Sequence, residues 1–287
     1  MSARGEEMVG IVVVSHSPDL ARAAVSLALH MVNGPAPRIE IAAGTSDDGL
    51  GTDAAAVADA IVTADDGEGV VVIMDLGSAV LSAELAHELL PMPGIQVRLV
   101  PAAFVEGIFA AVISASGGGQ LDAVARDAEE ALRAKALQLG KAEPSADADV
   151  IIARPTIVAT ATIGNADGIH ARPAALIVEA LASLEAQVTI ATQHSAAVSA
   201  RSPTALMSLG TRAGDVLRIE ADGAGAETAV DRIVELVRDD FGELEGFDRP
   251  SPQAAGFDGL GQQPLGVSPG RVAGPALRMP DLITEPD

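Results

Sequence analysis

Two histidines of this chain stand where a helix is expected to begin, and histidine is the side chain that titrates near neutral pH. His170 lies in the run Gly-Ile-His-Ala-Arg-Pro-Ala-Ala, residues 168–175. Pro173 is tolerated in the first turn of a helix, so the run predicts a helix that starts directly after the histidine. The amides of Ala171 and Arg172, the positive end of the helix dipole and the Arg172 guanidinium could then all face an anion on the ring. This arrangement suits a histidine that carries a phosphoryl group.

The second histidine, His16, follows an apolar strand and precedes Ser17 and Pro18, which are typical of a helix cap and a first helical position. Asp75 follows the apolar strand 70–74. Chemistry in a parallel sheet lies beyond the carboxyl ends of the strands, so both residues are expected at one edge. Asp75 could there hydrogen-bond one ring nitrogen and leave the other nucleophilic. From these residues alone, a helix-capping aspartate and a solvated loop histidine are an equal alternative.

The first half of the chain alternates between apolar, β-branched runs and segments with helical spacing. Continuous apolar runs are typical of strands buried on both faces of a parallel sheet. The pattern predicts an α/β fold with a doubly wound, mostly parallel sheet. We expect strands at 10–14, 38–42, 70–74 and 96–100, and helices at 20–31, 53–64 and 78–90.

The segment around His170 has a different pattern, with shorter strands and three helices. We expect strands at 156–163, 187–192, 196–200 and 215–221, and helices at 171–184, within 201–210 and at 227–237. The motifs "GIHARPAA", "LMSLG" and "IEADG" stand in this order and spacing, and the segment 155–240 resembles the phosphocarrier protein HPr. The resemblance implies an α+β open-faced sandwich, phosphorylation of His170 on Nδ1, and Arg172 as a residue that steadies the phosphate.

The same resemblance bears on Ser202, which matches a position where some HPr proteins carry a regulatory phosphoserine. Pro203 departs from the aliphatic residue usual at the next position. We therefore interpret Ser202 first as the N-cap of the short helix.

Three motifs of the first half, "VVVSHSPDLA", "IAAGTSDDGLGTDAAAVADAI" and "VVVIMDLGSAVLSAELA", carry a second resemblance. Residues 8–139 resemble the mannose-type IIA domain found in phosphotransfer subunits of phosphoenolpyruvate-dependent dihydroxyacetone kinases. The likeness implies phosphorylation of His16 on Nε2, with Asp75 as its orienting partner. It also places the loops 51–53 and 77–78 beside the site. The supporting residues expected around the two phosphate sites are Ser17, Gly44, Thr45, Thr52, Gly77, Ser78 and Ala171.

Composition limits the other functions that the chain could have. A net charge of −22 disfavours nonspecific nucleic-acid binding, which needs clustered cations. No apolar run approaches the roughly 20 residues of a membrane span, and residues 1–7 do not resemble a signal peptide. The chain has no cysteine and five scattered histidines, so we expect no metal and no organic cofactor. These features favour a cytoplasmic protein.

Two segments rich in small and polar residues are expected to act as linkers, at 141–154 and 242–263. A flexible chain of the first length spans roughly 20 Å, which would let the His170 domain reach His16. The run "PLGVSPGRVAGPALRM" within 264–287 resembles the opening of enzyme I of the phosphotransferase system, without that enzyme's histidine or phosphoenolpyruvate-binding part. We therefore expect phosphate to arrive from enzyme I in trans.

The sequence thus predicts a phosphoryl relay. Enzyme I would phosphorylate His170, His170 would pass the group to His16, and His16 would deliver it to ADP held by a dihydroxyacetone kinase subunit. A homodimer through the first domain is implied by the resemblance only. Two alternatives remain open, a IIA–HPr fusion of a mannose-type sugar permease and a regulatory module that signals its phosphorylation state.

Overall fold

The structure is a computed structural model, and it describes residues 7–45, 49–90, 94–139, 141 and 155–242. All of these belong to one compact unit, Met1–Phe247. Most of the first expected linker, nearly all of the second, and the enzyme I-like segment 264–287 lie outside the described residues.

The first domain is built on a four-stranded sheet in the order β2-β1-β3-β4. Its strands are β1 (Gly10–Ser15), β2 (Ile39–Ala43), β3 (Val70–Met74) and β4 (Val97–Val100). All three pairings are parallel, and the central strands β1 and β3 are buried along their whole length. The continuous apolar runs of the sequence are explained by this burial on both faces.

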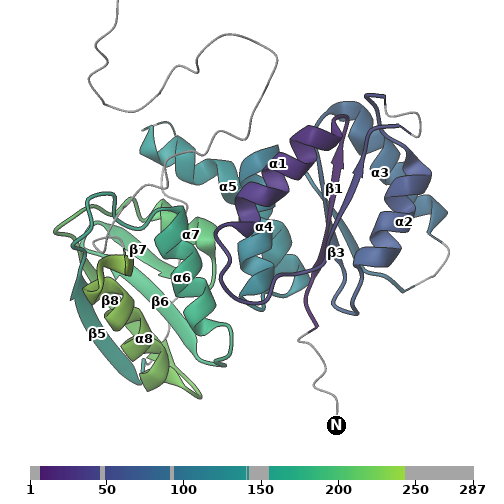
Figure 1. Ribbon diagram of the computed structural model, residues 1–287. Coiled ribbons are helices and arrows are strands. Elements are labelled where there is room, and N and C mark those ends of the chain that lie inside the picture. Colours follow the sequence, from purple (N-terminus) through teal and green to yellow (C-terminus); the bar gives the residue numbers. More distant parts are fainter. Residues whose placement is uncertain (1–6, 46–48, 91–93, 140, 142–154, 243–287) are drawn as a thin grey trace, which may run out of the picture. The chain divides into compact units, whose positions relative to one another are not determined.

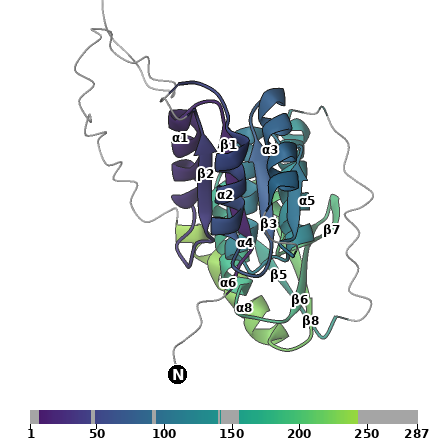
Figure 2. The same cartoon turned by 90° about the vertical axis from the view of Figure 1, so that its right-hand side faces the viewer.

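Helices cover both faces of this sheet, as the doubly wound pattern predicts. They are α1 (Pro18–Leu29), α2 (Ala54–Ala64), α3 (Gly77–Leu89), α4 (Phe104–Ser116) and α5 (Leu121–Gln138). Figure 1 shows α1 and α4 on one side of β1 and β3, with α2 and α3 on the other. Figure 2, turned by 90°, brings α2 and α3 to the front of the strands. Each helix layer has its own buried cluster against the sheet.

Helices α4 and α5 were not among the expected helices, although they fall inside the expected first domain. The sequence of α4 is apolar almost all around, and eight of its residues from Gly107 to Ala115 are buried. Such a helix shows no single apolar face, so hydrophobic periodicity does not reveal it. The α5 sequence does alternate polar and apolar residues at helical spacing, so its pattern was sufficient to predict a helix.

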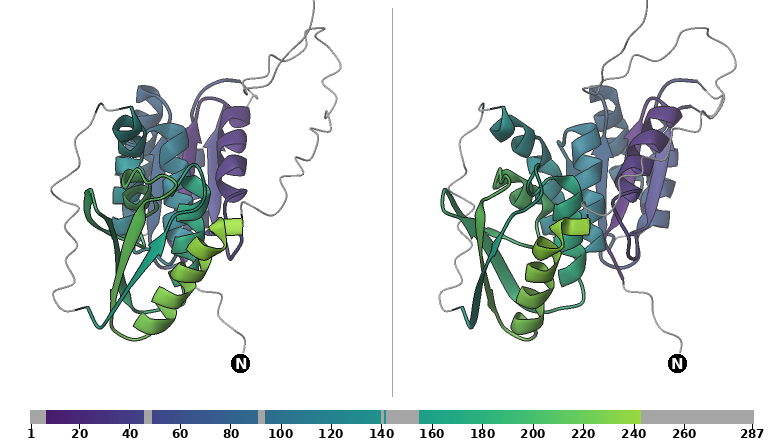
Figure 3. Two further views of the ribbon diagram at one scale, coloured as in Figure 1. Left: turned by 90° about the vertical axis from the view of Figure 1, so that its left-hand side faces the viewer. Right: turned by 60° about the vertical axis from the view of Figure 1, so that its left-hand side comes forward.

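The second domain contains an antiparallel sheet in the order β5-β8-β6-β7. Its strands are β5 (Ile157–Thr162), β6 (Gln187–Thr192), β7 (Ser195–Ser199) and β8 (Val216–Asp222). The helices α6 (Ala171–Leu181), α7 (Pro203–Ser208) and α8 (Ala226–Arg238) accompany it. Figure 3 shows α8, the yellow-green helix, alongside the strands. The expected α+β sandwich is confirmed.

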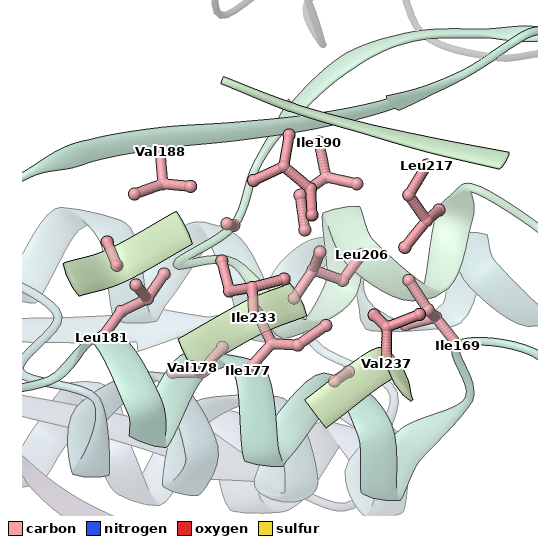
Figure 4. Close-up of a cluster of buried hydrophobic side chains, with 14 of the residues drawn as sticks. Ile169, Ile177, Val178, Leu181, Val188, Ile190, Leu206, Leu217, Ile233 and Val237 are labelled. Atoms are coloured by element: carbon pink, nitrogen blue, oxygen red, sulfur yellow. The ribbon is translucent and has the colours of Figure 1, made fainter. Parts of the chain in front are cut away.

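The core of this domain lies between the sheet and its helices. Figure 4 shows Val188, Ile190 and Leu217 of the strands directed toward the side chains of the helices, among them Ile177 and Ile233. All five side chains are buried. This packing fixes the position of α6, and therefore that of His170 directly before the helix.

The end of α6 differs from the expected one, whereas the start of α7 agrees with it. Helix α6 ends at Leu181 instead of residue 184, and the Arg201 guanidinium donates to the carbonyls of Leu181, Leu184 and Ala186 around this end. The Leu181 carbonyl also accepts from the Leu184 amide at 3.0 Å, in the turn that follows the helix. The interpretation of Ser202 as the N-cap of α7 is confirmed, since its Oγ accepts from the amide of Ala205 at 3.1 Å.

Candidate functional site

His16 lies directly after β1, at the carboxyl edge of the parallel sheet. Ser17 caps α1 through a 3.3 Å hydrogen bond from the Leu20 amide, and Pro18 opens the helix. The predicted strand–histidine–helix arrangement is thus the one observed. It holds the His16 backbone between two rigid elements while the ring stays about one-quarter exposed.

Asp75 follows β3, the strand paired with β1, and its carboxylate meets His16 twice. Its Oδ1 lies 2.9 Å from Nδ1 of the ring, and its Oδ2 accepts from the His16 amide at 2.8 Å. The hydroxyl of Ser15 also donates to Oδ2, at 2.9 Å. The side chain of Asp75 is only 8% exposed. One carboxylate therefore fixes both the backbone and the ring of the histidine.

The electrostatic balance at Asp75 favours its ionised form. Burial raises the pKa of this carboxyl, but hydrogen bonds from the His16 amide, the His16 ring, the Ser15 hydroxyl and the Leu76 amide outweigh that effect. The net result is a pKa below the ordinary value. Asp75 is consequently an acceptor of hydrogen bonds near neutral pH.

An ionised carboxylate can only accept, so the Nδ1 atom that faces it must carry the ring proton. In the neutral imidazole, Nε2 is then the nitrogen with the free electron pair. Nε2 lies 2.6 Å from Oγ of Ser78, which is therefore the donor in this contact. Ser78 is exposed and lies in the first turn of α3. The arrangement presents a nucleophilic nitrogen to solvent beside a hydroxyl donor.

Two glycines from the loops expected at this site contact the backbone of Ser15 and His16. The Gly51 amide donates to the His16 carbonyl at 3.1 Å, and the Gly44 amide donates to the Ser15 carbonyl at 3.1 Å. Gly44 has a φ of +79°, which a side chain would strain, and an added Cβ would lie 2.9 Å from Pro18. These contacts place both glycine loops at the base of the histidine.

The structure also gives the positions of the other first-domain residues that were expected at this site. The Thr45 amide donates to the Gly49 carbonyl, within the loop, at 3.0 Å. The Oγ1 of Thr52 lies 2.7 Å from Oγ of Ser82 on α3. Gly77 is exposed and begins α3, one residue before Ser78. Ser78 itself contacts the His16 ring directly.

His170 is the N-cap of α6, with an extended backbone at φ −100° and ψ −164°, and Ala171 opens the helix. The loop before it is rigidly held. Gly168 adopts φ +64°, and a Cβ there would lie 1.9 Å from the Thr211 carbonyl oxygen. The amide of Ile169 donates to Oγ1 of Thr211 at 2.7 Å. His170 is half-buried and lies at the N-terminus of α6, as predicted.

Arg172 is exposed on the first turn of α6, so its guanidinium is open to an incoming anion. The His16 ring contacts Asp75 and Ser78, both from its own domain, and its Nε2 faces Ser78. The structure thus brings together the first-domain residues and presents His170 with Ala171 and Arg172 on the second domain.

Sequence reasoning missed Ser15, whose hydroxyl joins Asp75 to the loop after β1. Ser15 is fully buried. The signal was available, since it is the polar residue that ends an otherwise apolar strand.

Among the described residues, no group of three or more His, Cys, Asp or Glu side chains could hold a metal ion. No helix within the described ranges is long and apolar enough to cross a membrane.

Two family models match the chain. Residues 10–125 match the "PTS system fructose IIA component" family, and residues 157–239 match the "PTS HPr component phosphorylation site" family. The phosphocarrier protein HPr of Streptomyces coelicolor is 38% identical over 82 residues, which are 29% of this chain and 88% of that protein.

Two further relatives are phosphoryl donor subunits DhaM of PEP-dependent dihydroxyacetone kinases. The one from Escherichia coli (strain K12) is 39% identical over 261 residues, 87% of this chain and 55% of that protein. The one from Listeria innocua, from its kinase 2, is 38% identical over 107 residues, 37% of this chain and 85% of that protein. The chain spans about half the length of the first curated relatives that it matches. With these identities and an observed IIA-like and HPr-like pair of domains, the chain belongs to the family of DhaM phosphoryl donor subunits.

Proposed function

We propose that this chain relays a phosphoryl group from enzyme I to Nδ1 of His170, then to Nε2 of His16, and finally to ADP bound by a dihydroxyacetone kinase subunit. The observation that supports this most is the contact of His16 Nδ1 with Asp75, which leaves Nε2 as the nucleophile beside Ser78. The match of the second domain to the HPr phosphorylation-site family supports the role of His170.

Transfer of the phosphoryl group from His170 to His16 needs no reactant other than the two histidines. The electron pair on Nε2 forms a bond to phosphorus while the bond from phosphorus to the His170 nitrogen breaks and its electrons return to that ring. The His16 ring keeps its Nδ1 proton and becomes more positive, and ionised Asp75 stabilises that charge at 2.9 Å. The Ser78 hydroxyl, released from Nε2, can donate to a phosphoryl oxygen.

The step at His170 uses the start of α6. Amides in the first helical turn have no acceptor within the helix, and the helix dipole is positive there. Arg172 adds a planar guanidinium that can bind two phosphoryl oxygens at once. Because transfer between two histidines exchanges similar bonds, alignment and fixed positive charge are the main requirements.

Delivery from His16 repeats this chemistry with an oxygen acceptor, the terminal phosphate of ADP. A mannose-type sugar permease is the competing destination, and the IIA-type match of the first domain is the observation that favours it. A homodimer through the first domain and a cytoplasmic location stay predictions of this proposal.

The test begins with labelled phosphoenolpyruvate, purified enzyme I and the full chain. Peptide mapping under conditions that preserve phosphohistidine should find label on His16 and His170. The chain is then separated and mixed with a kinase subunit loaded with ADP, and the label should appear in ATP. Label on both histidines with no transfer to ADP would contradict the proposed acceptor. Label on neither would contradict the proposal as a whole.

A further inference from the structure

A buried carboxylate that the relay does not use lies on α5, at Asp127. The hydroxyl of Ser202, the N-cap of α7, donates to its Oδ1. The Thr204 hydroxyl donates to the backbone carbonyl of Asp127 at 2.9 Å. Ser202 and Thr204 belong to the HPr-like domain and Asp127 to the IIA-like domain, so α5 and α7 meet through a polar contact.

An apolar contact continues from this polar one. Ile113 of α4 is 2% exposed and belongs to the same buried cluster as the core of the HPr-like domain, with Phe109 packed against it. Gly117, the C-cap of α4, approaches α6 so closely that an added Cβ would lie 2.2 Å from Cγ1 of Val178. The two domains therefore share a packed surface along α4 and α5 on one side and α6 and α7 on the other.

This surface extends toward the loop that carries His170. Leu137, near the end of α5, lines a cavity of about 570 Å³ together with Asp167, Ile169 and Arg212 of the HPr-like domain. Asp167 and Ile169 belong to the segment directly before the histidine. The IIA-like domain thus covers the α7 side of the carrier domain, next to its reactive loop.

We propose that α4 and α5 of the IIA-like domain form a docking surface for the α7 face of the HPr-like domain, held by the Ser202–Asp127 contact, and that this contact must open before His170 can reach His16. The second half of this inference rests on the proposed relay. The HPr-like domain contacts the α4 and α5 side of the parallel sheet, whereas Nε2 of His16 faces Ser78 of α3, which lies on the other side of β1 and β3 (Figure 1). Transfer needs that nitrogen in line with the phosphorus on His170.

The docking contact also defines a role for Ser202 that differs from a regulatory phosphorylation site. Its Oγ both donates to Asp127 and accepts from the Ala205 amide. A phosphate on this atom would stand against the Asp127 carboxylate. Phosphorylation of Ser202 and docking therefore exclude each other.

The test changes charge at the contact and keeps the helix cap. In Ser202→Asp the new carboxylate can still cap α7, but it faces Asp127 and should open the contact. Adding Asp127→Asn to this variant removes the repulsion and supplies an amide donor, which should restore docking. Thr160→Asp adds the same charge on the exposed β5 surface and is the matched control. Gly117→Leu is an independent wedge against Val178.

Docking is measured by nitrogen-15 relaxation on the full chain, which reports how fast each domain tumbles. The wild type, Thr160→Asp and the double variant should show one shared tumbling time for both domains. Ser202→Asp and Gly117→Leu should show a shorter time for the HPr-like domain, with its amide spectrum still that of a folded protein. Independent tumbling in the wild type, or shared tumbling in both opening variants, would overturn the docking surface.

Transfer is measured separately, as the rate at which label moves from His170 to His16 within one chain. Opening should raise this rate severalfold in Ser202→Asp and Gly117→Leu, and the double variant should return to the wild-type rate. An unchanged or slower rate in domains shown to be open would overturn the requirement for release. Absence of any label on His16 in the wild type would instead contradict the relay and leave the docking result standing.

Discussion

Asp75 holds His16 by two atoms at once, with its Oδ1 2.9 Å from the ring Nδ1 and its Oδ2 2.8 Å from the backbone amide. A single hydrogen bond to the ring would fix the tautomer and leave the loop free to move. The second bond ties the loop itself to the end of β3. The direction of Nε2 is therefore set by the pairing of β1 and β3, the two central strands.

Replacing Asp75 should impair the His16 step and spare the His170 step. Asp75→Asn keeps one acceptor oxygen but cannot accept at both positions, so the ring tautomers should mix and the loop should loosen. We expect phosphorylation of His16 to slow by about ten- to a hundredfold, the effect of ~1.4–2.8 kcal/mol on a barrier. Nitrogen-15 shifts of the ring should show loss of the Nδ1-protonated form. Asp59→Asn, on an exposed part of α2, is the control. A wild-type tautomer and rate in Asp75→Asn would exclude this role.

Ser78 should contribute to the transition state more than to the resting site. Ser78→Ala frees Nε2 from its 2.6 Å contact but removes a donor to the phosphoryl oxygens. A hydrogen bond to a charged group is worth roughly 1.5–3 kcal/mol, so transfer into His16 should slow about tenfold or more. Rapid-quench measurement of label on His16 tests this, with Ser26→Ala on exposed α1 surface as the control. Faster transfer in Ser78→Ala would mean that the hydroxyl only blocks the nitrogen.

Arg172 should act through the shape of its side chain as well as its charge. Arg172→Lys retains a cation and loses the planar fork that binds two oxygens. We expect charging of His170 by enzyme I to slow by about ten- to a hundredfold, equivalent to ~1.4–2.8 kcal/mol. The control Arg238→Lys makes the same change at the exposed end of α8. Equal stopped-flow rates for Arg172→Lys and the wild type would show that the residue is only a surface cation.

Asp127 makes stability depend on pH in the direction opposite to most carboxylates. Burial, with a smaller contribution from Glu130, raises the pKa of this carboxyl from 3.8 to about 6, against hydrogen bonds from Ser114 and Ser202. Below pH 3.8 the group is protonated whether the protein is folded or unfolded. As pH rises toward 6, Asp127 ionises in the unfolded chain before it ionises in the folded protein. The free energy of unfolding therefore falls, by about 3 kcal/mol in all.

Asp127→Asn removes that titration. The free energy of unfolding of the variant minus that of the wild type should therefore increase as pH rises from 4 to 7, and level off above the folded pKa. Urea unfolding at several pH values measures this difference, in which titration of the other carboxylates cancels. A difference that stays flat with pH would mean that Asp127 titrates normally.

The strand-end positions of His16 and Asp75 could be predicted because parallel strands bury both faces and end at a common edge. The orientation of the ring could not, because it depends on Ser15 and Ser78, whose hydroxyl contacts no periodicity reveals. The start of α6 at Ala171 was predicted from Pro173. Its end was not, because no glycine or proline follows Leu181 to mark it.

The contact between α5 and α7 lay beyond prediction for a related reason. A buried aspartate looks in sequence like any polar residue on a helix, and nothing marks Ser202 as its partner 75 residues away. Helix α4 was not predicted because it is buried on nearly every side, so its sequence shows no amphipathic pattern.

The most direct test of the relay is the order in which the two histidines are labelled. Enzyme I and labelled phosphoenolpyruvate are added to full chains carrying His170→Ala or His16→Ala, and the position of the label is mapped over time. The relay predicts that His170→Ala abolishes label on His16, whereas His16→Ala leaves His170 fully labelled. Wild-type labelling of His16 in the His170→Ala chain would contradict it.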